Sequence, residues 1–269
     1  MNGASDAARE AAELLWRHRL AGTVLTALPP ALRPRNHAQG HAIQAQWPGV
    51  AGERVAGWKI AATSRAGQAH INVGGPLAGR ILSSFVLDAG TAASLAGNRM
   101  RVAEPEFAFR LGRDLPPRAT PYAVHEVLDA VTSLHPAFEI PDSRFAEFAL
   151  AGEAQLIADD ACCGAFVLAA AAPDGWRAID LRTHPVQAGV RGPDGHAKLE
   201  RTGHGGNVLG DPRSALAWLA NELSSLGITL EAGQFVSTGT CMLPMPIAPG
   251  DRAHADFGVL GGVSLAFEA

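Results

Sequence analysis

Short β-prone runs, separated by glycine and proline, fill the chain from Val55 onward. The sequence holds 30 glycines and 18 prolines in 269 residues, and both residue types interrupt regular helices and strands. Runs of this length with turn residues between them predict a β-rich core of short strands. The expected strands are 55–60, 83–87, 101–111, 137–140, 155–168, 186–191, 234–240 and 259–267.

Helical patterns precede these runs and interrupt them twice. Residues 5–28 and 37–46 are rich in alanine and leucine at roughly helical spacing. Residues 121–134 and 212–226 each place apolar side chains on one helical face. Pro212 suits the first turn of the last helix.

The length of the chain allows one large apolar core. No internal repeat or linker composition divides it. We therefore expect an α+β protein with a helical N-terminal extension over residues 1–55 and a β-rich catalytic domain over residues 56–269.

Charge and composition exclude several classes of partner. The formal net charge is -4, which gives no electrostatic reason to expect nucleic acid or an anionic membrane surface. The N-terminus carries charges where a signal peptide would be apolar, and the longest apolar stretch, 161–172, is too short to cross a bilayer. Three cysteines form no disulfide framework. These features indicate a soluble, cytoplasmic protein.

The most informative segment is 102–111, in which Glu104 and Glu106 stand two residues apart in a β-prone run. Side chains two apart project from the same face of a strand, so both carboxylates point the same way. Pro105 between them lacks an N–H and suits an edge or irregular strand. Hard oxygen donors in this arrangement suit Mg²⁺, Mn²⁺ or Ca²⁺. The alternative is a solvated strand face, which is the more common origin of such a short motif.

Glu139 and Lys59 are two further charged residues inside apolar runs. Burying an unpaired carboxylate is costly, so Glu139 needs a partner, and Arg144 is one candidate. Lys59 lies on the polar face of a strand or reaches into a pocket. In a pocket, its ammonium would suit a substrate carboxylate or acid/base work.

Two other segments carry weaker signals. The Thr238-Gly-Thr240 segment could place hydroxyls and N–H groups near an anion, although a turn at a strand end explains it equally. Cys162 and Cys163 precede an apolar run, where a buried and inert thiol is the favoured interpretation for at least one of them.

Several segments in the same order give the chain a family resemblance that extends from about residue 5 to the C-terminus. They are 57–60 (Gly-Trp-Lys-Ile), 63–64 (Thr-Ser), 104–116 (Glu-Pro-Glu-Phe-Ala-Phe-Arg-Leu-Gly-Arg-Asp-Leu-Pro), 138–145 (Phe-Glu-Ile-Pro-Asp-Ser-Arg-Phe), 207–212 (Asn-Val-Leu-Gly-Asp-Pro), 218–221 (Trp-Leu-Ala-Asn), 238–240 (Thr-Gly-Thr), 249–251 (Pro-Gly-Asp), 255–258 (Ala-Asp-Phe-Gly) and 260–262 (Leu-Gly-Gly). This series resembles the hydratase/decarboxylase branch of the fumarylacetoacetate hydrolase superfamily.

The resemblance implies a fold, a metal and a set of site residues. The fold would be a mixed β-sandwich roll preceded by helices, assembled into homo-oligomers. Mg²⁺ or Mn²⁺ would be held by the three acids Glu104, Glu106 and Glu139. Catalytic roles would fall to Lys59 and Glu106, and substrate contacts to Lys59, Ser64, Cys162, Thr238 and Thr240.

The chain departs from the family pattern near these residues. Leu77 stands where the hydratases carry an aspartate, and the decarboxylases tend to be apolar there. Asp160 replaces a usual asparagine, Cys162 a usual serine and Ala61 a usual glycine. These departures point to a specialised pocket.

The resemblance implies a small 2-oxo or 2-hydroxy-dienoic acid as substrate. The leading hypothesis is hydration of 2-hydroxypenta-2,4-dienoate (2-keto-4-pentenoate), or a close analogue, to a 4-hydroxy-2-oxo acid in the meta-cleavage catabolism of aromatic compounds. Decarboxylation of a 4-oxalocrotonate-type diacid comes second, and Leu77 leans towards it. Hydrolysis of an acylpyruvate is third, since His125 and Glu126 stand at a different place from the expected base. The non-enzymatic alternative is a binding module that kept the fold.

Overall fold

Two β-sheets form the centre of the molecule. The computed structural model describes residues 2–88 and 90–269. Within them, the larger sheet has eight strands in the order β2 (Leu77–Leu82), β1 (Val55–Ala61), β10 (Phe235–Thr240), β5 (Val102–Leu111), β6 (Val131–Ile140), β7 (Ala165–Leu168) and β3 (Val86–Leu87), with β11 (Met245–Pro246) paired to β5. The smaller sheet has five strands in the order β4 (Ala93–Ser94), β13 (Gly262–Glu268), β12 (Arg252–Asp256), β8 (Pro185–Arg191) and β9 (Ala197–His204).

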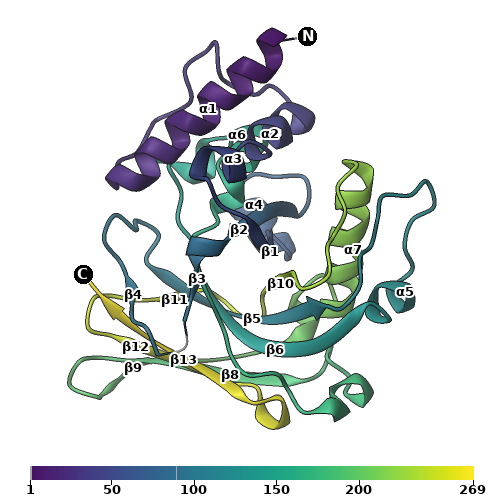
Figure 1. Cartoon of the computed structure of the whole chain (residues 1–269). Coiled ribbons are helices and arrows are strands. Elements are labelled where there is room, and N and C mark those ends of the chain that lie inside the picture. Colours follow the sequence, from purple (N-terminus) through teal and green to yellow (C-terminus); the bar gives the residue numbers. More distant parts are fainter. Residues whose placement is uncertain (1, 89) are drawn as a thin grey trace.

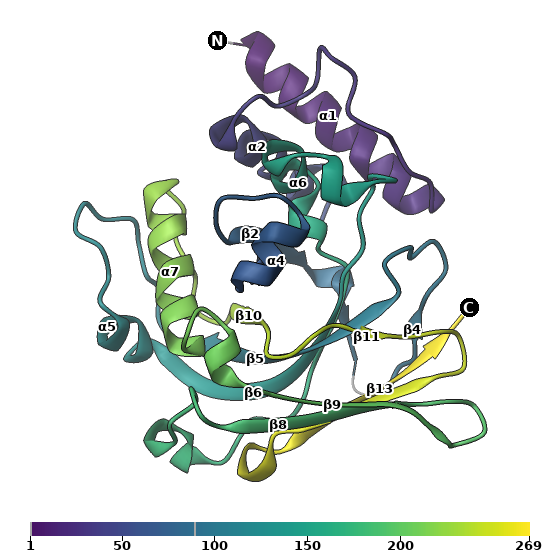
Figure 2. The ribbon, with the colours of Figure 1, turned by 180° about the vertical axis from the view of Figure 1, so that it is seen from behind.

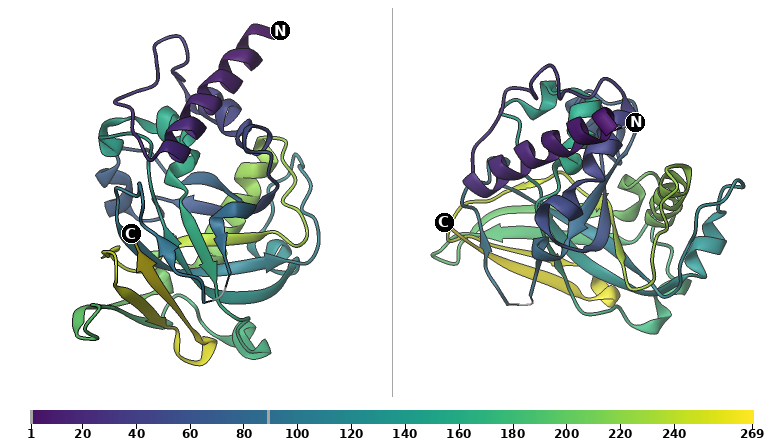
Figure 3. Two further views of the ribbon diagram at one scale, coloured as in Figure 1. Left: turned by 60° about the vertical axis from the view of Figure 1, so that its left-hand side comes forward. Right: turned by 45° about the horizontal axis from the view of Figure 1, so that its top comes forward.

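Helices and the smaller sheet lie on opposite sides of the larger sheet (Figure 1). The helical side contains α1 (Asn2–Ala21), α2 (His37–Gln44), α3 (Trp47–Ala51), α4 (Arg65–His70) and α6 (Glu153–Ala158), with α1 outermost (Figure 3). Two more helices, α5 (Val124–Leu128) and α7 (Pro212–Ser225), stand beside the sheet, as Figure 2 shows from behind.

Alternation along the central strands divides the core into two parts. Phe107 and Phe109 of β5 pack in the core that also contains Val190 and Leu265 of the smaller sheet. Ala108, between the two phenylalanines, packs instead in the core that contains side chains of α1 and α3. Side chains of β5 with the parity of Ala108 therefore face the helices.

Two of the predicted helices are confirmed and two predicted segments are wrong. The helices expected over 37–46 and 212–226 are present as α2 and α7. Asp211 caps α7 by accepting from the N–H of Arg213, and Pro212 fills its first turn. The helix expected over 121–134 ends at Leu128, because Val131 already begins β6, and the strand expected over 155–168 contains α6, a turn and β7.

Several other expected boundaries shift. The first helix was expected over 5–28 and ends at Ala21. The strands β2, β9 and β12 fall outside the predicted runs. β2 is buried along its length, and β9 exposes alternate polar side chains, so neither carries a clear apolar alternation.

The helices α1, α2 and α3 share a core with the larger sheet. Ala11 and Leu15 of α1 and Trp47 of α3 belong to the same apolar cluster as Phe166 and Phe235 of the sheet. The domain boundary expected between residues 55 and 56 stays a prediction. Among the described helices, none is both long and apolar enough to cross a membrane.

Candidate active site and metal centre

Three glutamates meet on the helix-facing side of the central strands. Glu104 of β5 lies directly opposite Glu139 of the antiparallel strand β6, and Glu106 lies two residues along β5. One carboxylate oxygen from each lies within 4.8 Å of the other two. Glu106 and Glu139 are buried and Glu104 is half-buried. The solvated-face alternative is therefore wrong, and the expected shared face is confirmed.

β5 is an interior strand, so the edge position suggested by Pro105 is wrong. It pairs with β10 on one side and β6 on the other. The pairing with β10 is irregular, because the register shifts between Ser237 and Thr240 beside the glutamates. The N–H that Pro105 lacks is thus accommodated by an irregularity within the sheet.

The negative charges of the three glutamates are only partly compensated by hydrogen bonds and neighbouring positive charges. Within the described residues, Oε1 of Glu106 and Oε2 of Glu139 are buried without a hydrogen-bond partner. Burial, together with the neighbouring carboxylate of Glu139, raises the pKa of Glu104 to about 7. Burial and the carboxylates of Glu139 and Glu104 raise the pKa of Glu106 well above its ordinary value. A cation among these oxygens would relieve both effects, and three hard oxygen donors fit Mg²⁺, Mn²⁺ or Ca²⁺.

Lys59 brings an ammonium to this cluster from β1. Its Nζ lies 3.1 Å from Oε1 of Glu139 and donates to the carbonyl of Ala161 at 2.9 Å. Burial disfavours the ammonium, yet the carboxylate of Glu139 outweighs it and raises the pKa of Lys59 above its ordinary value. The lysine is therefore a buried cation. Arg144, the partner considered for Glu139, pairs with Asp142 and Asp159.

Two residues that the sequence analysis did not single out hold Glu106. The hydroxyl of Ser237 donates to Oε2 of Glu106 at 2.5 Å, and the N–H of Gly239 donates to the same oxygen at 2.8 Å. Gly239 has a φ of +96°, and a Cβ there would lie 2.3 Å from Oγ1 of Thr63. Glycine is thus required for the close approach. The Thr-Gly-Thr pattern was the available signal: it predicted N–H groups near an anion, and the N–H of Gly239 meets the carboxylate of Glu106.

The two threonines of that pattern bond to the backbone. Thr238 is buried, and its hydroxyl donates to the carbonyl of Phe107 at 2.8 Å. The hydroxyl of Thr240 donates to the carbonyl of Met242 at 2.8 Å. Both bonds stabilise the strand end, and substrate contacts by Thr238 and Thr240 stay predictions.

The segment after α6 forms an unusual turn beside Lys59. Asp160, Ala161 and Cys162 have φ of 55°, 52° and 60°, which is the left-handed region. This turn presents the carbonyl of Ala161 to Lys59. Oδ1 of Asp160 accepts from the N–H of Arg80 at 2.6 Å, and burial raises the pKa of Asp160 to about 7.

Cys162, Ser64 and Leu77, which the sequence analysis associated with the substrate pocket, lie in three different environments. Burial raises the pKa of the Cys162 thiol to about 12, so the thiol is protonated at neutral pH. Ser64 is exposed and caps α4 by accepting from the N–H of Gly67 at 3.0 Å. Leu77 packs in an apolar cluster with Ala161 and Cys162. Substrate contacts by Ser64 and Cys162 stay predictions.

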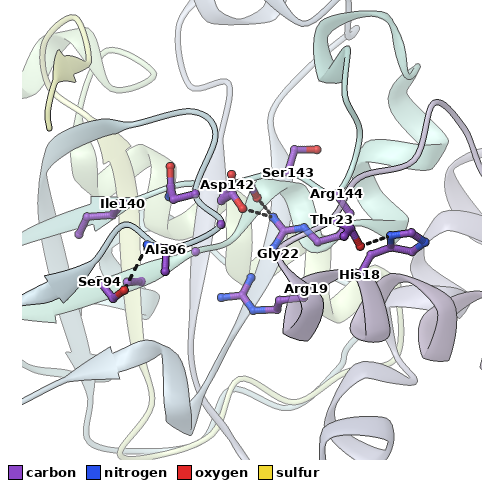
Figure 4. Close-up of a pocket in the computed structure, with 14 residues that line it drawn as sticks. His18, Arg19, Gly22, Thr23, Ser94, Ala96, Ile140, Asp142, Ser143 and Arg144 are labelled. Carbon is purple, nitrogen blue, oxygen red and sulfur yellow. Dashed lines mark hydrogen bonds and ion pairs between the residues drawn. The ribbon is translucent and has the colours of Figure 1, made fainter. Parts of the chain in front are cut away.

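A cavity of about 150 Å³ lies elsewhere, between the C-terminal end of α1 and the segment 142–144 (Figure 4). Arg19 and Arg144 line it, and Arg144 pairs with Asp142 there. None of the expected site residues lines this cavity. The glutamate cluster, rather than this cavity, carries the expected chemistry.

Comparisons with known proteins give a consistent set of relatives. The chain is 36% identical to a 2-hydroxyhexa-2,4-dienoate hydratase of Comamonas testosteroni over 81% of this chain and 80% of the relative. It is 31% identical to a 2-keto-4-pentenoate hydratase of Paraburkholderia xenovorans (strain LB400) over 97% and 94% of the two chains. No family profile matches the chain.

A solved structure resembles this one over nearly its full length. It is a 4-oxalocrotonate decarboxylase of Pseudomonas putida G7 complexed with magnesium and adipate. The TM-score is 0.84 at 25% identity, over 97% of each chain.

Proposed function

The chain belongs to the hydratase/decarboxylase branch of the fumarylacetoacetate hydrolase superfamily and is an enzyme of the lyase class, and from this membership we propose a metal-dependent hydratase. The substrate would be 2-hydroxypenta-2,4-dienoate or a close analogue, and the product a 4-hydroxy-2-oxo acid. The observation that carries the proposal is the cluster of three glutamates beside a buried ammonium, Lys59.

Glu104, Glu106 and Glu139 would hold Mg²⁺ or Mn²⁺. Their unpartnered buried oxygens and raised pKa values support this assignment. When bound, the ion would supply a Lewis acid and a template for the carboxylate and C2 oxygen of the substrate.

Lys59 would bind and orient the anionic end of the substrate. Its ammonium is fixed between Glu139 and the carbonyl of Ala161, so it offers a positive charge at a defined point. Because it is already an ammonium, in the first step it can donate the proton that C5 gains and then accept the proton that the C2 hydroxyl loses. In that step the C2 hydroxyl of the dienol loses a proton and C5 gains one, which gives a 2-oxo-3-enoate.

Glu106 is the proposed acid/base residue for the addition of water. Ser237 and Gly239 anchor one of its oxygens and leave Oε1 without a hydrogen-bond partner in the described structure. A carboxylate held in this way can take a proton from water. The hydroxyl of the water then adds at C4, and C3 gains a proton.

Decarboxylation of a 4-oxalocrotonate-type diacid is the second candidate. It is favoured by Leu77, which packs against Ala161 and Cys162 where the hydratases carry an aspartate. The similar solved structure is also a decarboxylase. Loss of CO₂ would leave a dienolate, whose negative charge the ion held by the same three glutamates could stabilise.

The test offers each substrate separately to the purified enzyme with Mg²⁺ or Mn²⁺. A hydratase consumes 2-hydroxypenta-2,4-dienoate, which is followed by its ultraviolet absorbance, and releases no CO₂. CO₂ release from 4-oxalocrotonate with an unchanged dienoate would overturn the proposal in favour of decarboxylation. For variants of the site glutamates, the exposed Glu200→Gln substitution is the matched control and should leave turnover unchanged.

Finer structural proposals follow from the same membership. We propose that the two sheets form the mixed β-sandwich roll of the superfamily, with residues 1–55 as a helical extension to a catalytic domain over residues 56–269. We also propose a cytoplasmic homo-oligomer acting on a small molecule.

A further inference from the structure

A second group of possible metal ligands lies between α2 and α7. His37 and His41 are one helical turn apart on α2, and Glu222 lies near the C-terminal end of α7. Their ligand atoms lie within 4.8 Å of one another. Two opposite views, Figures 1 and 2, both show α2 near this end of α7. The group is separate from the three glutamates and shares no residue with them.

The geometry of the group suits a tetrahedral ion. Nε2 of His37 and Nε2 of His41 each lie 3.6 Å from Oε1 of Glu222. Zinc bonds of about 2.1 Å at tetrahedral angles separate two ligand atoms by about 3.4 Å. Small side-chain rotations would therefore bring all three atoms onto one ion.

The protonation of His41 can be read from its neighbours. Gln44 donates through Nε2 to the carbonyls of Ala78 and Ile157 and accepts through Oε1 from Arg80, so the orientation of its amide is determined. Nδ1 of His41 lies 3.4 Å from that Oε1. Because Oε1 can only accept, Nδ1 carries the proton, and in the neutral ring Nε2 keeps its lone pair.

Two acceptors consequently face each other without a donor between them. His41 is 6% exposed, and within the described residues its Nε2 is buried without a hydrogen-bond partner. The atom it faces is a carboxylate oxygen of Glu222. Either a proton or a metal ion must lie between such groups, since each of them is an acceptor.

We propose that His37, His41 and Glu222 bind a zinc-type divalent transition-metal ion. Two imidazoles and one carboxylate suit zinc and its neighbours, whereas Mg²⁺ prefers oxygen ligands. The side chain of His37 is 43% exposed and that of Glu222 is 20% exposed, which leaves one coordination position open to solvent. The hydrogen bond that Nδ1 of His41 donates to Oε1 of Gln44 holds the ring in the orientation that a ligand needs.

The ion would connect the N-terminal helices to the catalytic body. α2 also carries Gln44, whose Oε1 accepts from Arg80 at 2.5 Å. The N–H of Arg80 in turn donates to Asp160, the first residue of the turn whose Ala161 carbonyl accepts from Lys59. A metal at this position would therefore fix the distance between α2 and α7 near the wall of the active site.

The test measures metal content rather than activity. The protein is stripped with a chelator, exposed to Zn²⁺ in excess Mg²⁺, dialysed and analysed for zinc. A Glu104→Gln/Glu106→Gln background removes the acidic triad as an alternative zinc site. In that background we expect one zinc per chain, and a Co²⁺ visible spectrum typical of tetrahedral coordination.

Variants at the solvent-exposed end of the group avoid disturbing the core. His37→Ala and Glu222→Gln should each weaken zinc binding by about 100-fold or more, since even residues that only support metal ligands contribute 10–100-fold. The exposed His196→Ala variant should bind zinc unchanged. Absence of zinc from the background protein, or zinc that persists in both His37→Ala and Glu222→Gln, would overturn the proposal. Thermal melting checks that each variant is folded.

Discussion

The described part of the molecule holds two groups of three potential metal ligands, which differ in burial and in ligand type. We call them the strand cluster (Glu104, Glu106 and Glu139) and the helix cluster (His37, His41 and Glu222). The strand cluster contains only carboxylates, two of which are buried, and the pKa of each is raised, chiefly by burial. The helix cluster is partly open to solvent, and the neighbouring imidazoles of His41 and His37 lower the pKa of Glu222. In the strand cluster three carboxylates share one ammonium, that of Lys59, whereas in the helix cluster a single carboxylate faces two imidazoles.

This difference follows from the elements that hold each cluster. Adjacent antiparallel strands place carboxylates opposite each other at close range whether or not a cation is present. The helix cluster joins side chains from two helices, and two of its members, His37 and Glu222, are partly exposed to solvent. The ligand types therefore predict different ions: a hard Mg²⁺ or Mn²⁺ at the strand cluster and zinc at the helix cluster.

The largest expected effect is that of Glu106→Gln. Turnover should fall by about 1,000-fold or more, because both a metal ligand and the proposed base are removed. The metal-free variant should nevertheless be more stable than the parent by roughly 1–3 kcal/mol, since an amide removes a buried unpaired charge. Steady-state kinetics and urea unfolding in a chelator measure the two effects. A variant with full turnover would contradict the scheme.

The stability difference should also depend on pH. The pKa of Glu106 is raised in the folded protein, so the folded state binds protons more tightly than the unfolded state. Metal-free stability therefore declines as the pH rises above the ordinary glutamate range, and this decline should be smaller in Glu106→Gln. If the unfolding free energies of the two proteins changed equally with pH, burial would not be raising the pKa of the Glu106 carboxylate.

Lys59→Met comes next in size. Turnover should fall by about 100-fold, within the range for loss of an acid/base or orienting group. Unlike Glu106→Gln, this variant should lower the metal-free stability by about 3–5 kcal/mol, because Glu139 loses its buried counter-charge. Bound Mg²⁺ should recover part of that loss. Equal stability of the variant and the parent in a chelator would argue against the buried ion pair.

The smallest effect is expected from Glu222→Gln in the metal-free protein. The pKa of Glu222 is lowered by the imidazoles of His41 and His37 beside it, so the carboxylate contributes stability above its ordinary pKa that is lost as the pH falls through the lowered value. Because the side chain is partly exposed and solvent screens its charge, this contribution is less than about 1 kcal/mol near neutral pH. Chemical unfolding at pH 7 and pH 3 measures it. If Glu222→Gln instead raised the unfolding free energy, as expected for Glu106→Gln, the two clusters would not differ in how their carboxylates affect stability.

The local patterns of the sequence predicted much of the site. The shared face of Glu104 and Glu106 follows from strand periodicity, and α2 and α7 follow from helical spacing and capping. Glu139 and Lys59 were noticed as charges among apolar neighbours. Ser237 was missed because nothing local distinguishes its hydroxyl from those of the nearby threonines, whereas Gly239 lies inside a segment expected to place N–H groups near an anion.

Long-range pairing accounts for what the sequence could not predict. The interior position of Pro105 depends on β10 and β6, which come from distant parts of the chain. The predicted helix over 121–134 was wrong because Val131 pairs with Leu111 of β5. A local apolar pattern of that length fits a helix or a buried strand equally well.

The sequence by itself determined which residues share a strand or helix face, because covalent geometry sets those periods. It therefore placed two carboxylates side by side on one strand, and the ordered segments indicated the family. Only the tertiary structure decided that Glu139 stands opposite Glu104, that a left-handed turn at Ala161 meets Lys59, and that α2 reaches Glu222. Those contacts join residues far apart in the chain, and they form because burial of the shared core brings their elements together.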